Sequence, residues 1–432
     1  MSHAPTTDAL NKANISYPAG AGTGMGMMLM GAGALLVAGA ALLGYTHFGH
    51  VAASQALAAY HLATMAVLAM SLGAMFFVMV FQLTNAGWTG TLRRQFENIM
   101  SFVPFAFLMV VPTLVIEVAR NHTDSGHIFS WLKPEMAGNH ELQAKWTYFF
   151  GPTSTPGTVG ALPIFFIVRA AIYGIFWTFL SRRLMSLSLQ QDQTGDRTLT
   201  IKARFMSSWG MLLFALTTAF AAFDWLMSLD FRFFSTMWGV YYFAGAAFSA
   251  SGLAALILAV LRLRGKLKGA VTEEHFHDLG KLMFTFTVFW GYIGFSQYFL
   301  IWYSNLPEET AYFNFRATPQ WLPWGRMLII GHFVIPFLVL LFRGVKRNPK
   351  LLIVMALWAV LLEVVDMYWV VRPVVYGKAA GPGTPAMIVD LLAIFGVLAV
   401  FAGYLVRKIP ESNLVAVNDP RMEEALGHVN YV

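Results

Sequence analysis

The stretch LLIVMALWAVLLEVVDMYWVV at 351–371 places the strongest constraint on what this chain can fold into. It is almost wholly apolar, and ~20 helical residues suffice to cross the ~30 Å hydrocarbon core of a bilayer. It nevertheless contains two carboxylic acids, Glu363 and Asp366, which are three positions apart and therefore share one helix face. An acid at such depth costs roughly 2.5–3.5 kcal/mol on insertion scales, and intramembrane acids usually serve a function. The stretch predicts a membrane helix with a functional polar face.

The composition of the whole chain indicates a multi-pass membrane protein. Of the 432 residues, 57% are hydrophobic and 12% are charged, whereas soluble domains carry about 25% charged residues. The formal net charge of +7 is what basic cytoplasmic loops produce, so it does not indicate nucleic-acid binding. The chain has no cysteine, which excludes disulfides, cysteine-ligated iron–sulfur clusters and thiolate metal sites.

Apolar stretches recur along the chain, and we expect an all-α integral membrane domain of ten transmembrane helices at 25–406. Residues 1–24 are expected to form a cytoplasmic lead that lacks the pattern of a cleaved signal peptide. Residues 407–432 are expected to form a cytoplasmic tail, too short to fold alone. The predicted spans are 25–43, 57–81, 99–118, 159–180, 206–227, 234–261, 282–301, 327–342, 351–371 and 387–406.

The distribution of basic residues predicts the orientation. Most of the 29 Lys and Arg lie near the two ends and in the loops after the second, fourth, sixth and eighth spans. The positive-inside rule therefore places both termini in the cytoplasm. Two long loops, 120–158 and 304–326, then face outward, and loops of this length are often functional or docking surfaces.

The ionisable residues inside the predicted spans lie almost entirely in the outer halves, and only Arg169 is expected at the middle of its span. The cytoplasmic half of the domain is expected to be almost purely apolar. Because carboxylates and histidines in membranes commonly form proton relays, we interpret the set as an outward-facing pocket or proton half-channel. The set consists of His61, Glu117, Arg169, Asp224, His332, Glu363, Asp366 and Asp390.

Several of these residues also have a purely structural interpretation. His61, Glu117 and Asp390 are predicted near the interface, where hydration or snorkelling would satisfy them. Arg169 and Asp224 would then form an ion pair that holds two helices together.

His332 raises two further alternatives. It lies four residues before Pro336, and its ring could satisfy a carbonyl group that the proline leaves free. A haem held by His61 and His332 is also conceivable, although the two are predicted at different depths.

A secondary transporter is a third class of function, but no pair of broken helices at matching positions supports it.

Two segments carry a family resemblance. One is FAAFDWLMSLD at 220–230, which continues into STMWGVYYFAG at 235–245, and the other is GYIGFSQYFLIWYSNLPEET at 291–310. Together they resemble the quinone-binding membrane subunits of bacterial alternative complex III, a quinol:electron-acceptor oxidoreductase. Those subunits are related to the NrfD-like membrane anchors of polysulfide reductases. The ten spans and short termini are most similar to the second, shorter of the two paralogous subunits.

The resemblance implies two four-helix bundles, spans 2–5 and 6–9, flanked by spans 1 and 10. A weak similarity between Phe223-Asp-Trp225 and Val365-Asp-Met-Tyr-Trp369 also hints at such a duplication. The implied setting is the bacterial inner membrane, with a paralogous NrfD-like subunit, a periplasmic iron–sulfur subunit and cytochrome c subunits as partners. The chain itself would hold no metal or redox cofactor. Only one of the two paralogous subunits would exchange electrons between quinol and an iron–sulfur cluster, and the second is expected to contribute mainly to proton translocation, so the ligand of this chain would be quinone or quinol only if this copy binds one.

On this interpretation the site consists of Asp224, Glu363, Asp366, His332 and Arg169. Glu363 would be the deep proton acceptor, and Asp366 would relay protons toward the outer surface. Arg169 would favour the charged form of the acids through its opposite charge. The alternative is a membrane scaffold without its own quinone or proton site, in which the same residues are structural.

Overall fold

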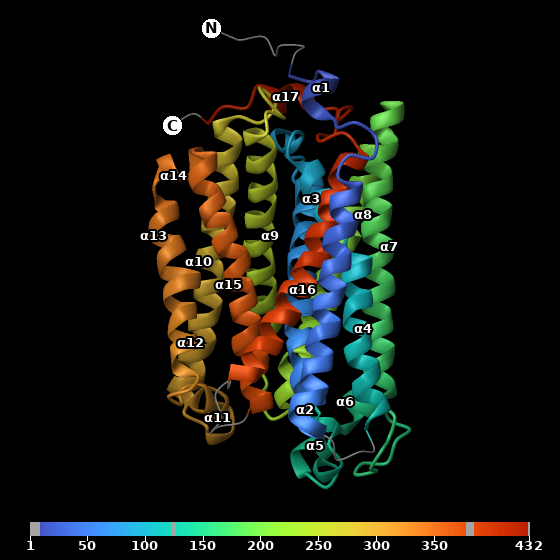
Figure 1. Ribbon diagram of the computed structural model, residues 1–432, viewed down its shortest axis with the longest axis vertical. Helices are drawn as coiled ribbons and strands as arrows, with labels where there is room; N and C mark the ends of the chain where they lie inside the picture. Colours follow the sequence, from blue (N-terminus) through green and yellow to red (C-terminus); the bar gives the residue numbers. More distant parts are fainter. Residues whose placement is uncertain (1–8, 122–126, 377–383, 431–432) are drawn as a thin grey trace.

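The computed structural model describes residues 9–121, 127–376 and 384–430, and these ranges contain helices, turns and loops but no strand. The long helices lie side by side along one axis (Figure 1). They are α2 (Thr23–Leu83), α4 (Val103–Ala119), α7 (Ile164–Thr194), α8 (Thr198–Trp225), α9 (Trp238–Leu263), α10 (Glu273–Ser304), α15 (Pro349–Tyr376) and α16 (Thr384–Lys408).

Short helices close the two ends of this assembly. We call the end with the chain termini, α14 and α17 the termini face, and the end with α5, α6 and α11 the loop face (Figure 1). The shorter helices are α1 (Lys12–Ile15), η1 (Gly87–Thr89), α3 (Arg93–Met100), η2 (Ser130–Leu132), η3 (Pro134–Met136), α5 (His140–Ala144), α6 (Trp146–Phe150), η4 (Met227–Asp230), α11 (Pro307–Arg316), α12 (Leu322–Met327), η5 (Leu328–Val334), α13 (Ile335–Leu341), α14 (Arg343–Arg347), η6 (Ile409–Glu411) and α17 (Met422–Leu426).

Within the described ranges, nine helical segments are long and apolar enough to cross a membrane, which indicates a multi-pass membrane protein. Nine of the ten predicted spans correspond to these segments. The remaining one lies in α10, which runs beside α9 over the same height (Figure 1). Its tyrosine, tryptophan and glutamine side chains lower its mean hydropathy, so length and composition alone do not identify it as a span.

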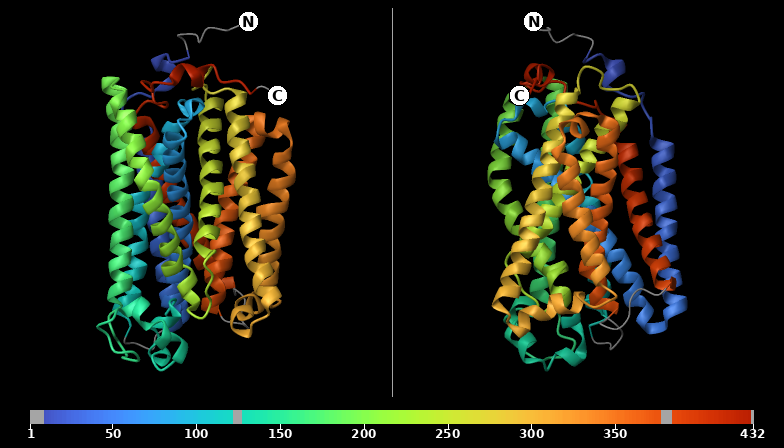
Figure 2. Two further views of the ribbon diagram at one scale, coloured as in Figure 1. Left: turned by 180° about the vertical axis from the view of Figure 1, so that it is seen from behind. Right: turned by 90° about the vertical axis from the view of Figure 1, so that its left-hand side faces the viewer.

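The first two predicted spans form one assigned helix, α2, whose two apolar segments are Thr23–Thr46 and Ser54–Leu83. The chain reverses direction between these segments (Figure 2). Thr23–Thr46 packs antiparallel to α16 through glycines: a Cβ on Gly33 would lie 2.5 Å from the carbonyl oxygen of Gly396. Small residues let membrane helices approach this closely. This pair of helices lies at the side of the molecule.

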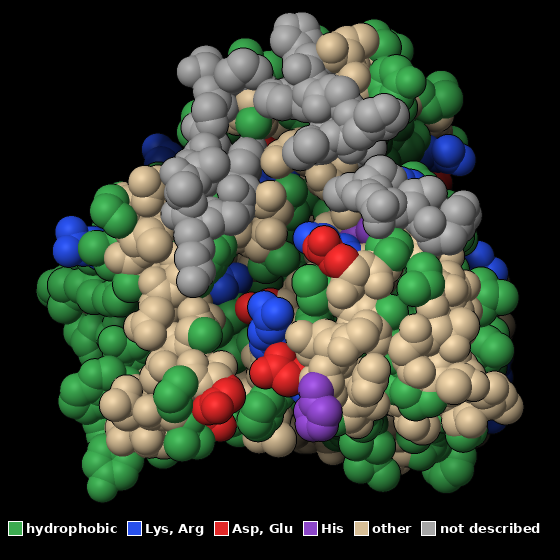
Figure 3. Space-filling model, turned by 90° about the horizontal axis from the view of Figure 1, so that it is seen from below, with side chains coloured by type: hydrophobic (Ala, Val, Ile, Leu, Met, Phe, Trp, Pro, Cys, Tyr) green, Lys and Arg blue, Asp and Glu red, His purple; other side chains and the backbone are tan. Residues whose placement is uncertain are grey.

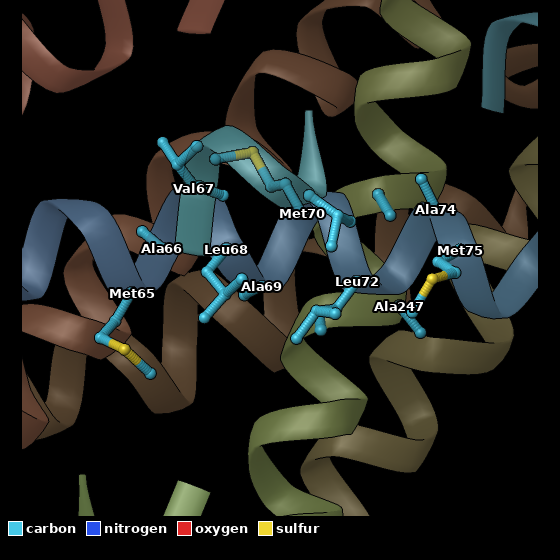
Figure 4. Close-up of a cluster of buried hydrophobic side chains, with 14 of the residues drawn as sticks. Met65, Ala66, Val67, Leu68, Ala69, Met70, Leu72, Ala74, Met75 and Ala247 are labelled. Carbon is cyan, nitrogen blue, oxygen red and sulfur yellow. The ribbon is translucent and has the colours of Figure 1, made fainter. Parts of the chain in front are cut away.

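Ser54–Leu83 is the central helix of the fold. In its most apolar stretch of 18 residues 89% are buried, whereas in that of Thr23–Thr46 only 17% are buried. It contacts α4, α8, α9 and α15. Small and flexible side chains line it, from Met65 to Met75, and they pack against α9 at Ala247 (Figure 4). A Cβ on Gly73 would meet the carbonyl oxygen of Ala246, so glycine is required where the two helices cross.

The other long helices gather on either side of this central helix. On one side α7 contacts both α4 and α8, and on the other side α10 contacts α9, α13 and α15. The two sides meet where α8 contacts α9.

Some predicted boundaries differ from the structure. The fourth span starts at Ile164 rather than at 159, because Pro163 is the N-cap of α7, and the helix continues to Thr194. The eighth span is not a uniform α-helix, since its middle, η5, is a π-helix. The indole N–H of Trp358 donates to the carbonyl oxygen of Gly331 within it at 2.7 Å.

Charged residues are also buried on the side of the termini, in α3, which precedes most of the predicted third span at 99–118. Every residue of α3 is buried, including Arg93, Arg94 and Glu97. Arg94 donates to Asp192 at 2.7 Å, and Arg93 pairs with both Glu97 and Asp419. Carboxylates from three segments neutralise the two arginines and allow their burial.

Candidate functional site

The five predicted site residues form two separate clusters rather than one pocket. The Asp224 cluster consists of Asp224, Arg169, Tyr148 and Tyr173. The Asp366 cluster consists of Asp366, Glu363, His332, Tyr241 and Trp290. The two clusters share no residue, hydrogen bond or ring contact within the part of the chain that the structure describes.

The carboxylate of Asp224 is buried and fully hydrogen-bonded. Arg169 donates to both of its oxygens, from Nε at 2.8 Å and from Nη2 at 2.7 Å. The hydroxyl groups of Tyr148 and Tyr173 each donate at 2.9 Å. A two-point arginine–carboxylate pair with further donors satisfies most lone pairs of the acid. This arrangement favours the structural ion pair.

Arg169 does not have the position that the sequence suggested, and its role is the structural one of the two that were considered. Because α7 begins at Ile164, Arg169 lies in the second turn from the loop face and not at the middle of a span. Its guanidinium covers the ring of Tyr148 at 4.0 Å and donates to the carbonyl oxygen of that residue at 2.6 Å. The expectation that Arg169 acts on Glu363 and Asp366 is wrong, since its acidic partner is Asp224.

Asp366 is equally buried but is held by neutral donors. The hydroxyl of Tyr241, from α9, donates to Oδ1 at 2.5 Å, and the indole N–H of Trp290, from α10, donates to Oδ2 at 3.1 Å. No described cation forms a salt bridge with this carboxyl group, in contrast to Asp224. A membrane carboxyl group without a cation partner is chemically suited to take up and pass on protons.

Glu363 lies one helical turn before Asp366 on α15 and is fully buried. Among the described residues, neither of its carboxyl oxygens has a hydrogen-bond partner. Its polar neighbours are Asp366 and Ser249, but the hydroxyl of Ser249 donates to the carbonyl oxygen of Gly245 at 2.8 Å. A Cβ on Gly245 would lie 2.8 Å from Oε2 of Glu363, so this glycine makes room for the acid.

His332 lies in the π-helix η5, and both of its ring nitrogens lack a partner among the described residues. Its ring packs edge-on against Trp290, with centroids 3.9 Å apart, and against Phe248 at 5.0 Å. It therefore does not satisfy a carbonyl group freed by Pro336, as the structural interpretation proposed. Short π-helical segments inside α-helices occur frequently at functional sites.

A cavity of about 710 Å³ borders the Asp366 cluster. Tyr241 and Trp290, the two donors to Asp366, form part of its wall. Aromatic and aliphatic side chains line most of it, and the polar lining residues include Gln297, Arg316 and Arg326. A volume of this size with few polar groups suits a small organic ligand.

The cavity reaches the lateral apolar surface between α10 and η5. Its lining residues Tyr292, Phe295 and Ile329 are 64%, 65% and 61% exposed. Their exposure on the sides of helices, rather than on the loop face, gives the cavity an opening toward the membrane. A lipid-soluble ligand could enter from there without crossing water.

Arg316 closes the cavity toward the loop face. Pro373 has no N–H group to donate to the carbonyl oxygen of Trp369 four residues earlier in α15. Arg316 supplies this donor from Nε at 3.3 Å and also donates to the carbonyl oxygen of Val370 at 2.9 Å. Its guanidinium covers the ring of Tyr312 at 3.5 Å. A buried cation thus lies at the edge of the cavity.

The three remaining residues of the predicted polar set are buried with defined partners and are not hydrated at an interface. Glu117 accepts from the backbone N–H groups of Ile128 and Phe129, and these bonds hold that part of the loop between α4 and α7 against the end of α4. His61 binds the carbonyl oxygen of Trp225 through Nε2 at 2.8 Å. Asp390 forms a buried ion pair with Arg372 and connects α16 to α15.

Sequence reasoning missed the donors that distinguish the two clusters. Tyr241 lies inside the segment 235–245 that carried the family resemblance, and Trp290 directly precedes the segment 291–310. A buried acid needs donors, so aromatic residues with an O–H or N–H group on neighbouring apolar helices were a usable signal. Tyr148 gave no such signal, because it lies on a short helix of the long loop.

The loop face shows acidic and basic side chains together near its centre and hydrophobic side chains along its flanks (Figure 3).

The described residues contain no group of three His, Asp or Glu residues that could hold a metal ion. His61 and His332 have separate neighbours, Trp225 and Phe129 for the first and Trp290 and Phe248 for the second. A scan of protein-family models and a search of curated proteins found no match to this chain.

Proposed function

We propose that this chain is a membrane subunit of a respiratory quinol:electron-acceptor oxidoreductase, and that the cavity beside Asp366 binds quinol. The observation that carries the proposal is the shared wall: Tyr241 and Trp290 line the cavity and both donate to one buried, uncompensated carboxyl group. A ligand ring in the cavity would lie next to a hydrogen-bonded route to that acid.

The proposal includes ten spans, arranged as two four-helix bundles with one flanking helix pair, and cytoplasmic termini. The nine apolar segments together with α10 support the count. The basic loops of the termini face support the orientation. The cavity then belongs to the outer half of the membrane, next to a periplasmic electron acceptor.

The chemistry divides between this chain and its partners. Oxidation of a quinol releases two electrons and two protons. The electrons would pass to an iron–sulfur subunit, and the protons need acceptors at the ring oxygens. Tyr241 would pass a proton from one ring hydroxyl to Asp366 along the 2.5 Å hydrogen bond. Asp366 would then pass this proton to Glu363, one turn deeper on α15, and would be free to accept the second quinol proton. The two carboxyl groups would together hold both protons before these leave toward the outer side.

The test compares Asp366→Asn with Asp224→Asn in the purified complex, with quinol-dependent turnover and proton release measured together. A positioned acid or base typically contributes 10²- to 10⁴-fold, so Asp366→Asn should lower turnover by about 10²-fold with assembly intact. Asp224→Asn should leave the turnover of the assembled fraction unchanged, because its carboxylate serves an ion pair. Tyr241→Phe should reproduce part of the Asp366 effect.

Glu363→Gln separates a quinol pocket from a proton half-channel. Loss of proton release with normal turnover would assign this chain to proton translocation. The scaffold alternative is favoured only for the Asp224 cluster, whose acid is fully paired. Normal turnover and proton release in both Asp366→Asn and Glu363→Gln would extend that role to the whole chain and refute the proposal.

A further inference from the structure

A second lateral groove, of about 690 Å³, lies between α4 and α7, remote from the Asp366 cluster. Its apolar walls include Leu108, Ile175 and Phe179, which are 60%, 71% and 52% exposed. The ring of Phe107 forms its floor against Gly174, where a Cβ would lie 2.1 Å from Phe107 Cε1. The missing side chain at Gly174 thus makes room for the ring of Phe107, which packs directly against the backbone of α7.

Two arginines, Arg182 and Arg183, line the end of this groove nearer the termini face. Both are exposed, and neither forms a hydrogen bond, ion pair or ring contact with another described residue. They differ in this from Arg93 and Arg94, whose charges are neutralised by carboxylates. The groove therefore combines a long apolar trough with two uncompensated cations at one end.

The depth of the two arginines fits a membrane boundary. Arg182 is about 27 Å along α7 from Ile164, at ~1.5 Å per residue. The hydrocarbon core is ~30 Å thick, so a slab that begins at the start of α7 ends near the two guanidinium groups. Side chains at that level reach lipid headgroups, while the trough below them lies at the level of acyl chains.

We propose that this groove is a binding site for an anionic phospholipid. An acyl chain would lie along Ile175 and Phe179, and the headgroup phosphate would bind between Arg182 and Arg183. Guanidinium groups bind phosphate through paired N–H donors, and basic pockets between membrane helices are recognised sites for anionic headgroups. A ligand that is apolar along its length and anionic at one end matches the groove in both respects. The proposal does not depend on the quinol function.

The test measures lipid affinity by native mass spectrometry on the full chain, purified with its associated subunits and delipidated. Phosphatidylglycerol and phosphatidylcholine with identical acyl chains serve as probes. Two cations near a headgroup contribute about 1 kcal/mol each, so Arg182→Gln/Arg183→Gln should weaken phosphatidylglycerol binding about 30-fold. Phosphatidylcholine carries the same phosphate but offsets it with a choline cation, so it should bind more weakly to the unaltered protein and lose less affinity in the variant.

Two further variants keep the test decisive. Ile175→Trp fills the trough without changing the charge and should reduce retention of both lipids. Arg262→Gln/Arg264→Gln removes two cations near the end of α9, outside this groove, and should change phosphatidylglycerol affinity less than twofold. Equal loss in this control, or no loss in the Arg182/Arg183 variant, would overturn the proposal. So would a photo-crosslinker at Phe179 that labels another subunit instead of lipid.

Discussion

At the scale of single residues, two buried aspartates near the loop face have different hydrogen-bond donors: one is paired with a cation, and the other has neutral donors only. Asp224 faces a guanidinium and two tyrosine hydroxyls, whereas Asp366 faces one hydroxyl and one indole N–H. The two-point contact with the cation makes Asp224 a structural element. The neutral donors around Asp366 can serve either the charged or the protonated acid with small rearrangements.

The ion pair of Asp224 predicts a stability effect. Asp224→Asn leaves Arg169 without its anion in a largely buried place, and breaking such a pair costs about 3–5 kcal/mol. We expect a lower thermal midpoint and a lower yield of assembled protein, measured by scanning fluorimetry and size-exclusion chromatography. The double variant Asp224→Leu/Arg169→Met removes both charges and should regain most of the loss. A double variant as unstable as the single one would contradict this account.

The sequence allowed prediction of the acids but not of their partners. That Glu363 and Asp366 share a helix face follows from their spacing, and the structure buries both. The pairing of Asp224 with Arg169 was one of two alternatives, because nothing in one sequence states which helices are neighbours. Tyr148 reaches Asp224 only because the loop between α4 and α7, which contains α6, folds back over α7. No pattern in the sequence near Tyr148 predicts that packing.

At the scale of helices, the antiparallel pair of Thr23–Thr46 and α16 depends on close backbone approach. Gly26 and Gly33 face Gly403 and Gly396 across the contact. Between them, Gly31 of the same helix points away from α16. The pair therefore offers a matched comparison within one helix.

Gly33→Leu should separate the two helices, while Gly31→Leu should not. A Cβ on Gly33 would lie 2.5 Å from the carbonyl oxygen of Gly396, whereas a Cβ on Gly31 meets nothing within 4 Å. Overpacking of this kind costs about 1–3 kcal/mol, and an exposed substitution usually changes stability by less than about 0.5 kcal/mol. Thermal midpoints in one detergent measure the difference. Equal midpoints would show that this contact does not hold the pair together.

Helix positions could be predicted from apolar runs, but helix ends could not. The run at 159–180 stops being apolar near Arg182 and Arg183, yet α7 continues to Thr194. Hydropathy reports which residues suit lipid, and a helix that extends beyond the hydrocarbon core has polar residues there. The π-helix η5 was likewise not predicted, because hydropathy does not distinguish a π-helix from an α-helix; within it, the carbonyl oxygen of Gly331 accepts from Trp358 of α15.

At the scale of the whole molecule, residues 409–430 cross the termini face and join helices that are far apart in the sequence (Figure 2). Gln95 donates to the carbonyl oxygen of Leu414 at 2.7 Å, and Asp419 pairs with Arg93. At the other end of the segment, Nε2 of His428 is hydrogen-bonded to Oδ2 of Asp278, near the start of α10, at 2.5 Å. The expected short tail is therefore an integral part of this face.

The start of α10 should make this attachment sensitive to acid. Burial lowers the pKa of His275 to about 4, and the nearby charges of His428, Asp278 and Glu274 modify it further. Burial alone would raise the pKa of Asp278, but hydrogen bonds from Lys281 and His428 hold it below its usual value. Because folded His275 resists protonation, its contribution is complete above about pH 6.5 and falls as the pH decreases toward 4, by roughly 3 kcal/mol at about 1.4 kcal/mol per unit.

Hydrogen exchange of residues 420–430 between pH 7 and pH 4 measures this effect. His275→Gln is the matched control, since glutamine can accept from the backbone N–H of Thr272 as His275 does at 3.1 Å. Protection should fall with acid in the unaltered protein and stay nearly constant in the variant until Asp278 titrates. Identical pH profiles for the two proteins would refute the role of His275.

Residues 409–430 leave the ribosome after every helix that they join. Until they are made, Arg93 lacks the carboxylate of Asp419, and the amide of Gln95 lacks the carbonyl oxygen of Leu414. Insertion of the helices can therefore be complete while the buried charges of α3 are only partly neutralised. A nascent chain that is stalled before residue 409 should hold its helices in the bilayer with the termini face still open.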